Sequence, residues 1–221
     1  MPEPSKPPSA HLRTYKVWEL ERIAQTQLNR LQDDFSLPVD IEKVLEETPG
    51  VDLDIWPKLQ ANHGLMGMVG TDDTGTMIVY IDDDLADADH LLRRYRMTVA
   101  EEYAHILLHR DAIGKVRSPA DFKELHNDPD WQTYDRNAKR LAAALLIPAS
   151  QVLSDSRLLY SKMVSVAGYG DPEAIKKMIK NKLADRYVVS TLSMGYRLSE
   201  WPVEVMSKID EAVQHQLAFL V

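Results

Sequence analysis

The chain has no cysteine among its 221 residues. Disulfide bonds, thiolate metal ligands and cysteine nucleophiles are therefore excluded. The chain also lacks any run of about 18 consecutive apolar residues, which a membrane-spanning helix needs, and no basic and then apolar signal segment opens it. Because the absence of disulfides is typical of a reducing compartment, we expect a cytoplasmic protein with no membrane association.

A surplus of positive charge is absent as well. Asp and Glu number 34 against 26 Lys and Arg, which gives a formal net charge of −8 at pH 7. Non-specific nucleic-acid binding comes mainly from cationic neutralisation of phosphates, so this balance argues against a nucleic-acid partner. Hydrophobic residues make up 44% of the chain and charged residues 27%, which is typical of a globular domain. The length suits one domain of ordinary size, or one domain with a helical extension.

Alternating and helical spacings of apolar residues predict a mixed fold. Segments 51–55, 65–71 and 76–81 are predicted as strands, and a turn at 72–75 separates the last two. We expect them to form a small, largely antiparallel sheet. Helices are predicted near 17–31, 40–47, 90–110, 134–146, 172–183, 190–197 and 202–220, with an acidic loop after residue 81 and a loop over 114–129. The pattern therefore predicts an α+β fold with a helical C-terminal part.

The predicted helix near 90–110 carries the residues best suited to chemistry. Glu101, His105 and His109 follow one another at four-residue intervals and point to roughly one side of a helix. Glu102 is displaced from Glu101 by about 100° around the axis. In zinc peptidases the pattern H-E-x-x-H uses two histidines to hold the metal, and the intervening glutamate takes a proton from water. Here the pattern is E-E-x-x-H, which taken alone is more often a solvated helix face.

A second segment strengthens the interpretation. The run DRNAKRLAAALLIP begins at Asp135 and contains three consecutive alanines, 142–144, ahead of Pro148. Small side chains allow two helices to pack closely, since the distance between axes depends on the side chains at the contact. We therefore expect this helix to lie against the first one and to bring Asp135 near it.

Together these segments resemble the ImmA/IrrE family of metallo-endopeptidases. Ala100–His109 is similar to a family motif of the form AHELGHLLLH, and Leu141–Pro148 is similar to the ending FAAELLMP. The segment Leu183–Leu198, LADRYVVSTLSMGYRL, resembles a third family segment. The resemblance implies a zincin-like fold, with the sheet packed on the motif helix. It also implies a metallopeptidase-like domain over residues 11–150, between a flexible tail at 1–10 and a helical extension at 151–221.

The resemblance further implies a site and a function. Glu101, His105 and Asp135 take the positions of the metal ligands, and Glu102 takes the position of the general base. The implied activity is that of a zinc-dependent hydrolase that acts on a regulatory protein, such as a helix-turn-helix repressor. Glu101 replaces a histidine and Asp135 replaces a glutamate, so this ligand set has two carboxylates. Oxygen-rich sets favour harder ions, so Mn²⁺ is an alternative to Zn²⁺.

Two other functions stay open at this point. The chain is either an active peptidase or a catalytically inactive relative that serves as a protein-binding regulatory module. A DNA-binding regulator is a third reading, because residues 173–200 hold six basic against three acidic side chains on two predicted helices. His109 either supports the metal site from behind the ligands or is a buried structural histidine.

Overall fold

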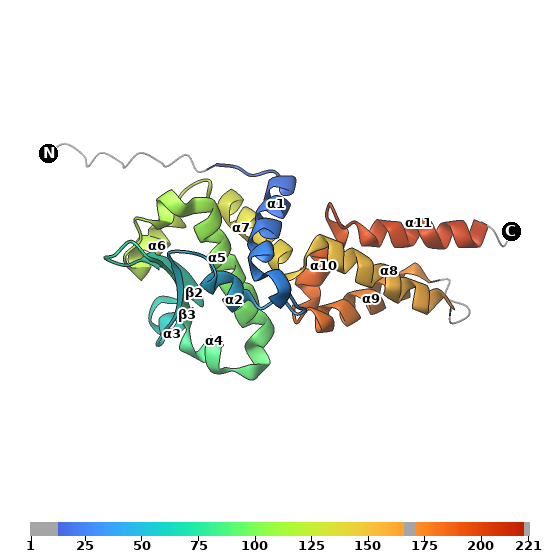
Figure 1. Cartoon of the computed structure of the whole chain (residues 1–221), viewed down its shortest axis with the longest axis horizontal. Coiled ribbons are helices and arrows are strands. Elements are labelled where there is room, and N and C mark those ends of the chain that lie inside the picture. Colours follow the sequence, from blue (N-terminus) through green and yellow to red (C-terminus); the bar gives the residue numbers. More distant parts are fainter. Residues whose placement is uncertain (1–12, 166–170, 219–221) are drawn as a thin grey trace.

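A three-stranded mixed sheet and a long helix form the N-terminal half of the molecule. The computed structural model describes residues 13–165 and 171–218, and Figure 1 shows the sheet at one end. The strands are β1 (Val51–Trp56), β2 (Gly67–Thr71) and β3 (Met77–Asp82), in the order β1-β3-β2. The expected tail at residues 1–10 lies outside the described residues. The architecture confirms the predicted α+β, zincin-like class.

The pairing of β1 differs from the prediction. β2 and β3 form the expected antiparallel hairpin, whose turn includes Gly75 at a φ of +88°. β1, however, pairs in parallel with β3, with Val51 opposite Met77. The short helix α3 (Leu59–His63) carries the chain across the sheet, so β2 starts at the far edge and β3 returns between the other two strands. The expectation of a largely antiparallel sheet was therefore wrong for β1.

Helix α5 (Leu92–Ile113) lies across the sheet and is the central element of this half. Helix α7 (Trp131–Leu146) packs along α5, and α1 (Val17–Leu28) packs against α7. Ala100 and Ala104 on α5, and Ala138 and Ala142 on α7, are fully buried. The small side chains on both helices explain their close approach, as the sequence predicted.

Shorter helices connect these elements, and two of them were not predicted. They are η1 (Asn29–Asp34), α2 (Ile41–Glu46), α4 (Asp83–Asp87), η2 (Asp89–Leu91) and α6 (Pro119–Leu125). α6 lies within the segment that we expected to be a loop, and Ser118 caps it by accepting a hydrogen bond from the Asp121 amide. α4 lies in the acidic segment, where the Asp82 carboxylate accepts from the Leu85 amide.

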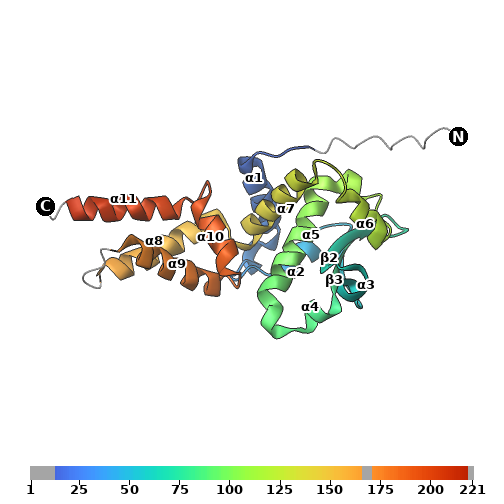
Figure 2. The same ribbon diagram turned by 180° about the vertical axis from the view of Figure 1, so that it is seen from behind.

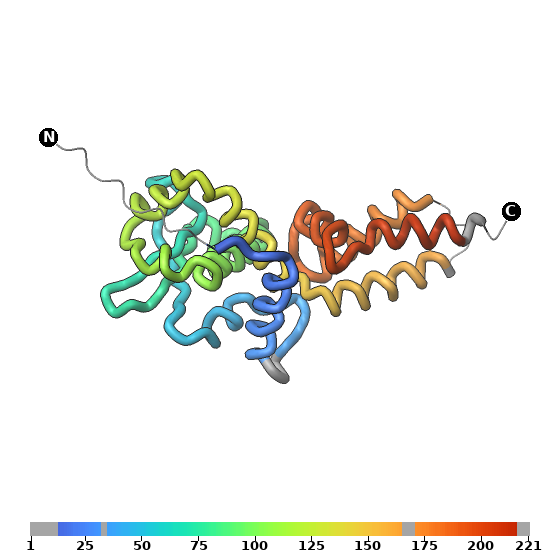
Figure 3. The backbone as a smooth tube through the Cα atoms, turned by 90° about the horizontal axis from the view of Figure 1, so that it is seen from above, coloured from blue at the N-terminus to red at the C-terminus, as the bar shows by residue number. Residues whose placement is uncertain are grey.

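Four helices extend from this half (Figures 1 and 2), in agreement with the expected helical C-terminal part, although α8, the first of them, was not among the predicted helices. They are α8 (Ala149–Ser165), α9 (Pro172–Arg186), α10 (Thr191–Ser199) and α11 (Val205–Ala218). The view from above in Figure 3 shows them projecting to one side of the sheet-containing half. The boundary that we expect at residue 150 falls at the start of α8 and stays a prediction. In the described part of the chain, no helix has the length and apolarity needed to cross a membrane.

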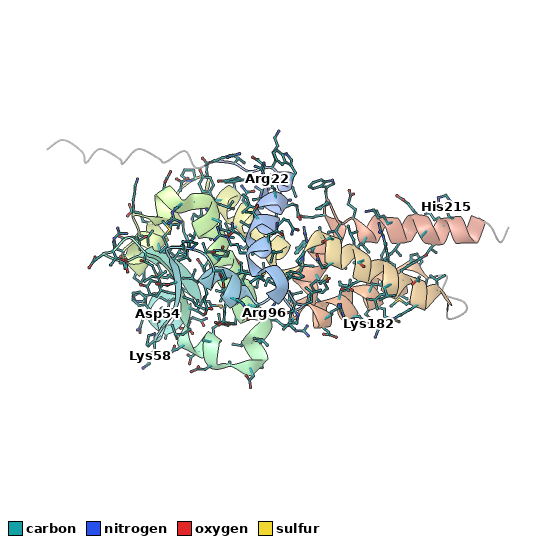
Figure 4. All side chains as sticks on the ribbon, in the orientation of Figure 1. Arg22, Asp54, Lys58, Arg96, Lys182 and His215 are labelled. Atoms are coloured by element: carbon teal, nitrogen blue, oxygen red, sulfur yellow. The ribbon has the colours of Figure 1, made fainter. Side chains whose placement is uncertain are left out.

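Contacts made by arginines, among them Arg197 and Arg96, join the halves. The buried Arg197 of α10 donates to the Ile147 carbonyl at 3.0 Å and forms an ion pair with Glu21 of α1. Arg96 of α5, labelled in Figure 4, donates to the carbonyl oxygens of Val39 at 2.8 Å and Val188 at 3.3 Å. These contacts satisfy backbone carbonyls at the junction and hold α10 beside the start of α8.

Candidate metal centre

Two helices bring together the three predicted metal-binding side chains. α5 carries Glu101 and His105 one turn apart, and α7 carries Asp135 near its first turn. One ligand atom of each of these residues lies within 4.8 Å of the corresponding atoms of the other two. His105 is only 2% exposed, whereas Glu101 and Asp135 are partly exposed. The side chains therefore converge on one point at the edge of the α5–α7 contact.

This spacing can be compared with what a metal requires. Two atoms bound to one tetrahedral zinc ion are about 3.4 Å apart when each bond is about 2.1 Å long. The three ligand atoms lie within 4.8 Å of one another, so side-chain rotations of a modest size are needed for them to bind one ion. One nitrogen and two carboxylate oxygens form an acceptable donor set for zinc and a good one for manganese. The residues present thus fit a divalent metal.

Glu102 lies beside this point, against β2, and is buried. An ideal Cβ placed on Gly67 would be 3.0 Å from Glu102 Cγ and 2.6 Å from Thr98 Cγ2, so only glycine permits this approach of β2 to α5. Glu102 Oε2 is buried and has no hydrogen-bond partner among the described residues. Burial, and then the negative charges of Glu101 and Asp135, raise the pKa of the Glu102 carboxyl well above its usual range. A buried carboxyl oxygen with no partner among the described residues, next to a set of possible ligands, is a candidate for a group that exchanges a proton with a nearby water.

The imidazole of His105 is held in place from two sides. Its Nδ1 lies 3.1 Å from Nδ1 of His109, and its ring stacks on Trp131 with a centroid distance of 5.1 Å and an interplanar angle of 6°. Burial lowers the pKa of His105 to about 3 and that of His109 to about 4, so both rings are neutral at neutral pH. With Nδ1 engaged by His109, Nε2 is the nitrogen left to bind a metal.

Lys139 completes the site, and no pattern in the sequence singled it out. Its Nζ lies 2.7 Å from Asp135 Oδ2 and 3.7 Å from Glu101 Oε1. Burial raises the pKa of the Glu101 carboxyl to about 7, although the positive charge of Lys139 acts in the opposite direction. The four-residue spacing from Asp135 on a predicted helix was the one available signal.

Two aromatic residues form a wall beside the site and were also missed. His126 packs on the face of Trp131, with ring centroids 4.3 Å apart, and Trp131 in turn stacks on His105. No sequence motif singled out His126 or Trp131. Nothing in the sequence indicated that His126 lies near the site, because α6, which ends just before His126, was expected to be a loop.

A second acidic cluster has a structural explanation. Asp82, Asp83 and Asp84 also bring carboxylate oxygens together. Asp82 accepts hydrogen bonds from the Gln60 and Leu85 amides, and Asp83 accepts from the Lys58 and Asp84 amides. These carboxylates cap α3 and α4, and we assign them no further role.

Comparison with known proteins agrees with the geometry. The family described as the IrrE N-terminal-like domain, peptidase M78, matches residues 62–199, which is more than half of the chain. A search of curated proteins found no match. The matched range contains β2, β3, the motif helix α5, α7 and the helices through α10. The chain therefore belongs to the IrrE N-terminal-like family of peptidases, the ImmA/IrrE family that its motifs resemble.

Proposed function

We propose that this chain is a metal-dependent endopeptidase-like protein whose metal ligands are Glu101, His105 and Asp135. The observation that carries the proposal is the convergence of these three side chains beside Glu102, one oxygen of which is buried and has no partner in the described part of the chain. Zn²⁺ is the expected ion, and Mn²⁺ is the alternative because two of the three ligands are carboxylates. When bound, the ion supplies the positive charge that polarises a peptide carbonyl and makes a nearby water more acidic.

The protein's own groups supply the remaining chemistry. Glu102 accepts a proton from the attacking water and returns it to the leaving amine, as a general base and then a general acid. His109 and Trp131 hold the His105 ring in one orientation. β2 is an edge strand that begins at Gly67, next to Glu102. An extended peptide added to that edge would pass beside the carboxylate, which suits a protein substrate.

The proposed substrate class is a regulatory protein such as a helix-turn-helix repressor, in a cytoplasmic setting. This part of the proposal rests on the family resemblance. It is tested by incubating the protein with repressor candidates and Zn²⁺ or Mn²⁺, and by looking for fragments. We expect stoichiometric metal in protein purified without chelators, loss of that metal in His105→Ala, and cleavage by the parent protein. Metal content that is unchanged in His105→Ala would exclude this site.

A catalytically inactive, protein-binding regulatory module is the second candidate. The observation that favours it is the Lys139 ammonium, which already pairs with Asp135 and approaches Glu101. This candidate predicts partner binding without fragments, with every metal tried. The DNA-binding reading of α9 and α10 has less support, because Lys176 of α9 is paired with Glu173 and Asp210. Sequence-specific duplex binding is its test.

A further inference from the structure

Lys139 occupies a defined place among the proposed ligands. It lies one helical turn after Asp135 on α7, so its side chain points along the same face toward α5. Its Nζ donates to Asp135 Oδ2 at 2.7 Å and lies 3.7 Å from Glu101 Oε1. The ammonium is thus located between the two carboxylates that a metal in this site needs.

The chemistry of the site makes Lys139 and a metal alternatives. Asp135 and Glu101 each offer negative charge to whatever cation lies between them, and an oxygen that accepts from an ammonium has fewer lone pairs for a metal. A cation at the ligand atoms would also be repelled by the ammonium at close range, in a site where burial weakens the screening by water. Both effects lower the affinity of these oxygens for a divalent ion.

The lysine is nevertheless able to leave. Its side chain is 53% exposed, compared with 23% for Glu101 and 28% for Asp135. A flexible four-carbon stem with a strongly hydrated head group is easily transferred to solvent, and exposed ion pairs contribute little stability. Lys139 therefore weakens metal binding without closing the site.

We infer that Lys139 is a built-in competitor of the metal, and that a divalent ion binds Glu101 and Asp135 only when the ammonium is displaced. The inference rests on the proposed metal site. Lys139 then determines how much free metal the protein needs before the site fills. It also links the two candidate functions, because the same chain is metal-free at low metal concentration and metal-bound at high concentration.

The test is metal affinity and not activity. Zn²⁺ and Mn²⁺ are titrated by calorimetry into the parent protein and into Lys139→Met, Lys139→Arg and Arg136→Met. Lys139→Met keeps the length of the stem but removes the charge. Arg136→Met removes the same charge from an exposed position of α7 that has no ion pair with Glu101 or Asp135 among the described residues. Circular dichroism confirms that each variant is folded.

We expect Lys139→Met to bind metal on the order of tenfold more tightly than the parent, and Arg136→Met and Lys139→Arg to remain close to the parent. If the parent protein binds metal through His105 but Lys139→Met binds it equally well or more weakly, the proposed competition is wrong and the proposed metal site is still supported. If Arg136→Met increases metal affinity as much as Lys139→Met does, the increase comes from the lower net positive charge and not from the position of Lys139. That result would also overturn the competition. No metal binding by any of the proteins would overturn the metal site itself and the competition with it.

Discussion

The Nδ1 atom of His105 lies 3.1 Å from the Nδ1 atom of His109, one turn further along α5. Both rings are buried, and each pKa is lowered by burial, so one ring carries the shared proton as a donor and the other accepts it. The sequence left open whether His109 supports the site or fills space. The contact places it directly behind the proposed ligand.

This contact predicts a role for His109 in metal binding. We expect His109→Ala to lower metal affinity by about tenfold or more, because a ligand histidine that loses its partner also loses its preferred orientation. The measurement is calorimetric titration with Zn²⁺, and His90→Ala, at an exposed position, is the matched control. An unchanged affinity in a folded His109→Ala protein would return His109 to a purely structural role.

Glu102→Gln tests catalysis. The amide has the same shape but cannot take a proton, and loss of a general base typically lowers the rate by about 10²–10⁴. We expect cleavage of a repressor substrate to fall by that factor while metal content stays close to the parent value. Glu124→Gln, at an exposed position of α6, should cleave like the parent. Undiminished cleavage by Glu102→Gln would contradict the assignment.

Glu101→His tests the ligand that departs from the usual motif. The change replaces an oxygen ligand with a nitrogen ligand and leaves one carboxylate in the set. We expect zinc affinity to rise relative to manganese affinity, because imidazole suits zinc better than manganese. Parallel titrations with the two ions provide the comparison. If the preference does not move toward zinc, Glu101 is not a ligand.

The pKa of Glu101 predicts how metal binding depends on pH. Burial raises this pKa to about 7, so the metal-free protein holds a proton on Glu101 at lower pH, and that proton must leave before the carboxylate binds an ion. The pKa of His105 is lowered to about 3, so His105 does not compete in this range. Metal affinity should therefore fall as the pH drops below about 7 and level off above it. Mn²⁺ titrations from about pH 5.5 to 8 measure this, and Glu101→Gln should remove most of the slope.

Gly67 predicts a steric limit at the site. A Cβ at this position would be 2.6 Å from Thr98 Cγ2, so Gly67→Ala forces β2 away from α5. Overpacking of this kind typically costs about 1–3 kcal/mol. We expect urea denaturation to show a loss of this size, together with a lower cleavage rate because Glu102 moves. Gly195→Ala is the control, since its new Cβ would meet only the flexible Lys180 Cδ at 3.4 Å.

The parts of the fold that have long periodic patterns could be predicted from the sequence. The motif helix, the hairpin strands and the approach of Asp135 follow from spacing and from small residues on α7. The parallel pairing of β1 could not be predicted, because it depends on where the chain leaves α3 and enters β2, and not on the residues of β1 itself. α6 was missed because a seven-residue helix shows too few periods to be distinguished from a polar loop.

For a similar reason, only some of the residues of the candidate site could be predicted from the sequence. Glu101, Glu102, His105 and Asp135 belong to motifs and could be named from the chain. Trp131 and Lys139 act through their positions in space, and a lone tryptophan or an exposed helical lysine has no distinguishing pattern. Their partners, His105 on a neighbouring helix and Glu101 across the helix contact, become apparent only once α5 and α7 are side by side.

The buried alanines of α5 and α7 have a consequence for metal selectivity. They allow a close approach between the helix that carries Glu101 and His105 and the helix that carries Asp135. At the proposed site, the distance between these helices would influence which ion the three side chains can reach together. A larger residue at Ala138 or Ala142 would increase the distance between the two helices without changing any of the proposed ligands. At the proposed site, the choice of ion would therefore depend partly on methyl groups that do not contact it.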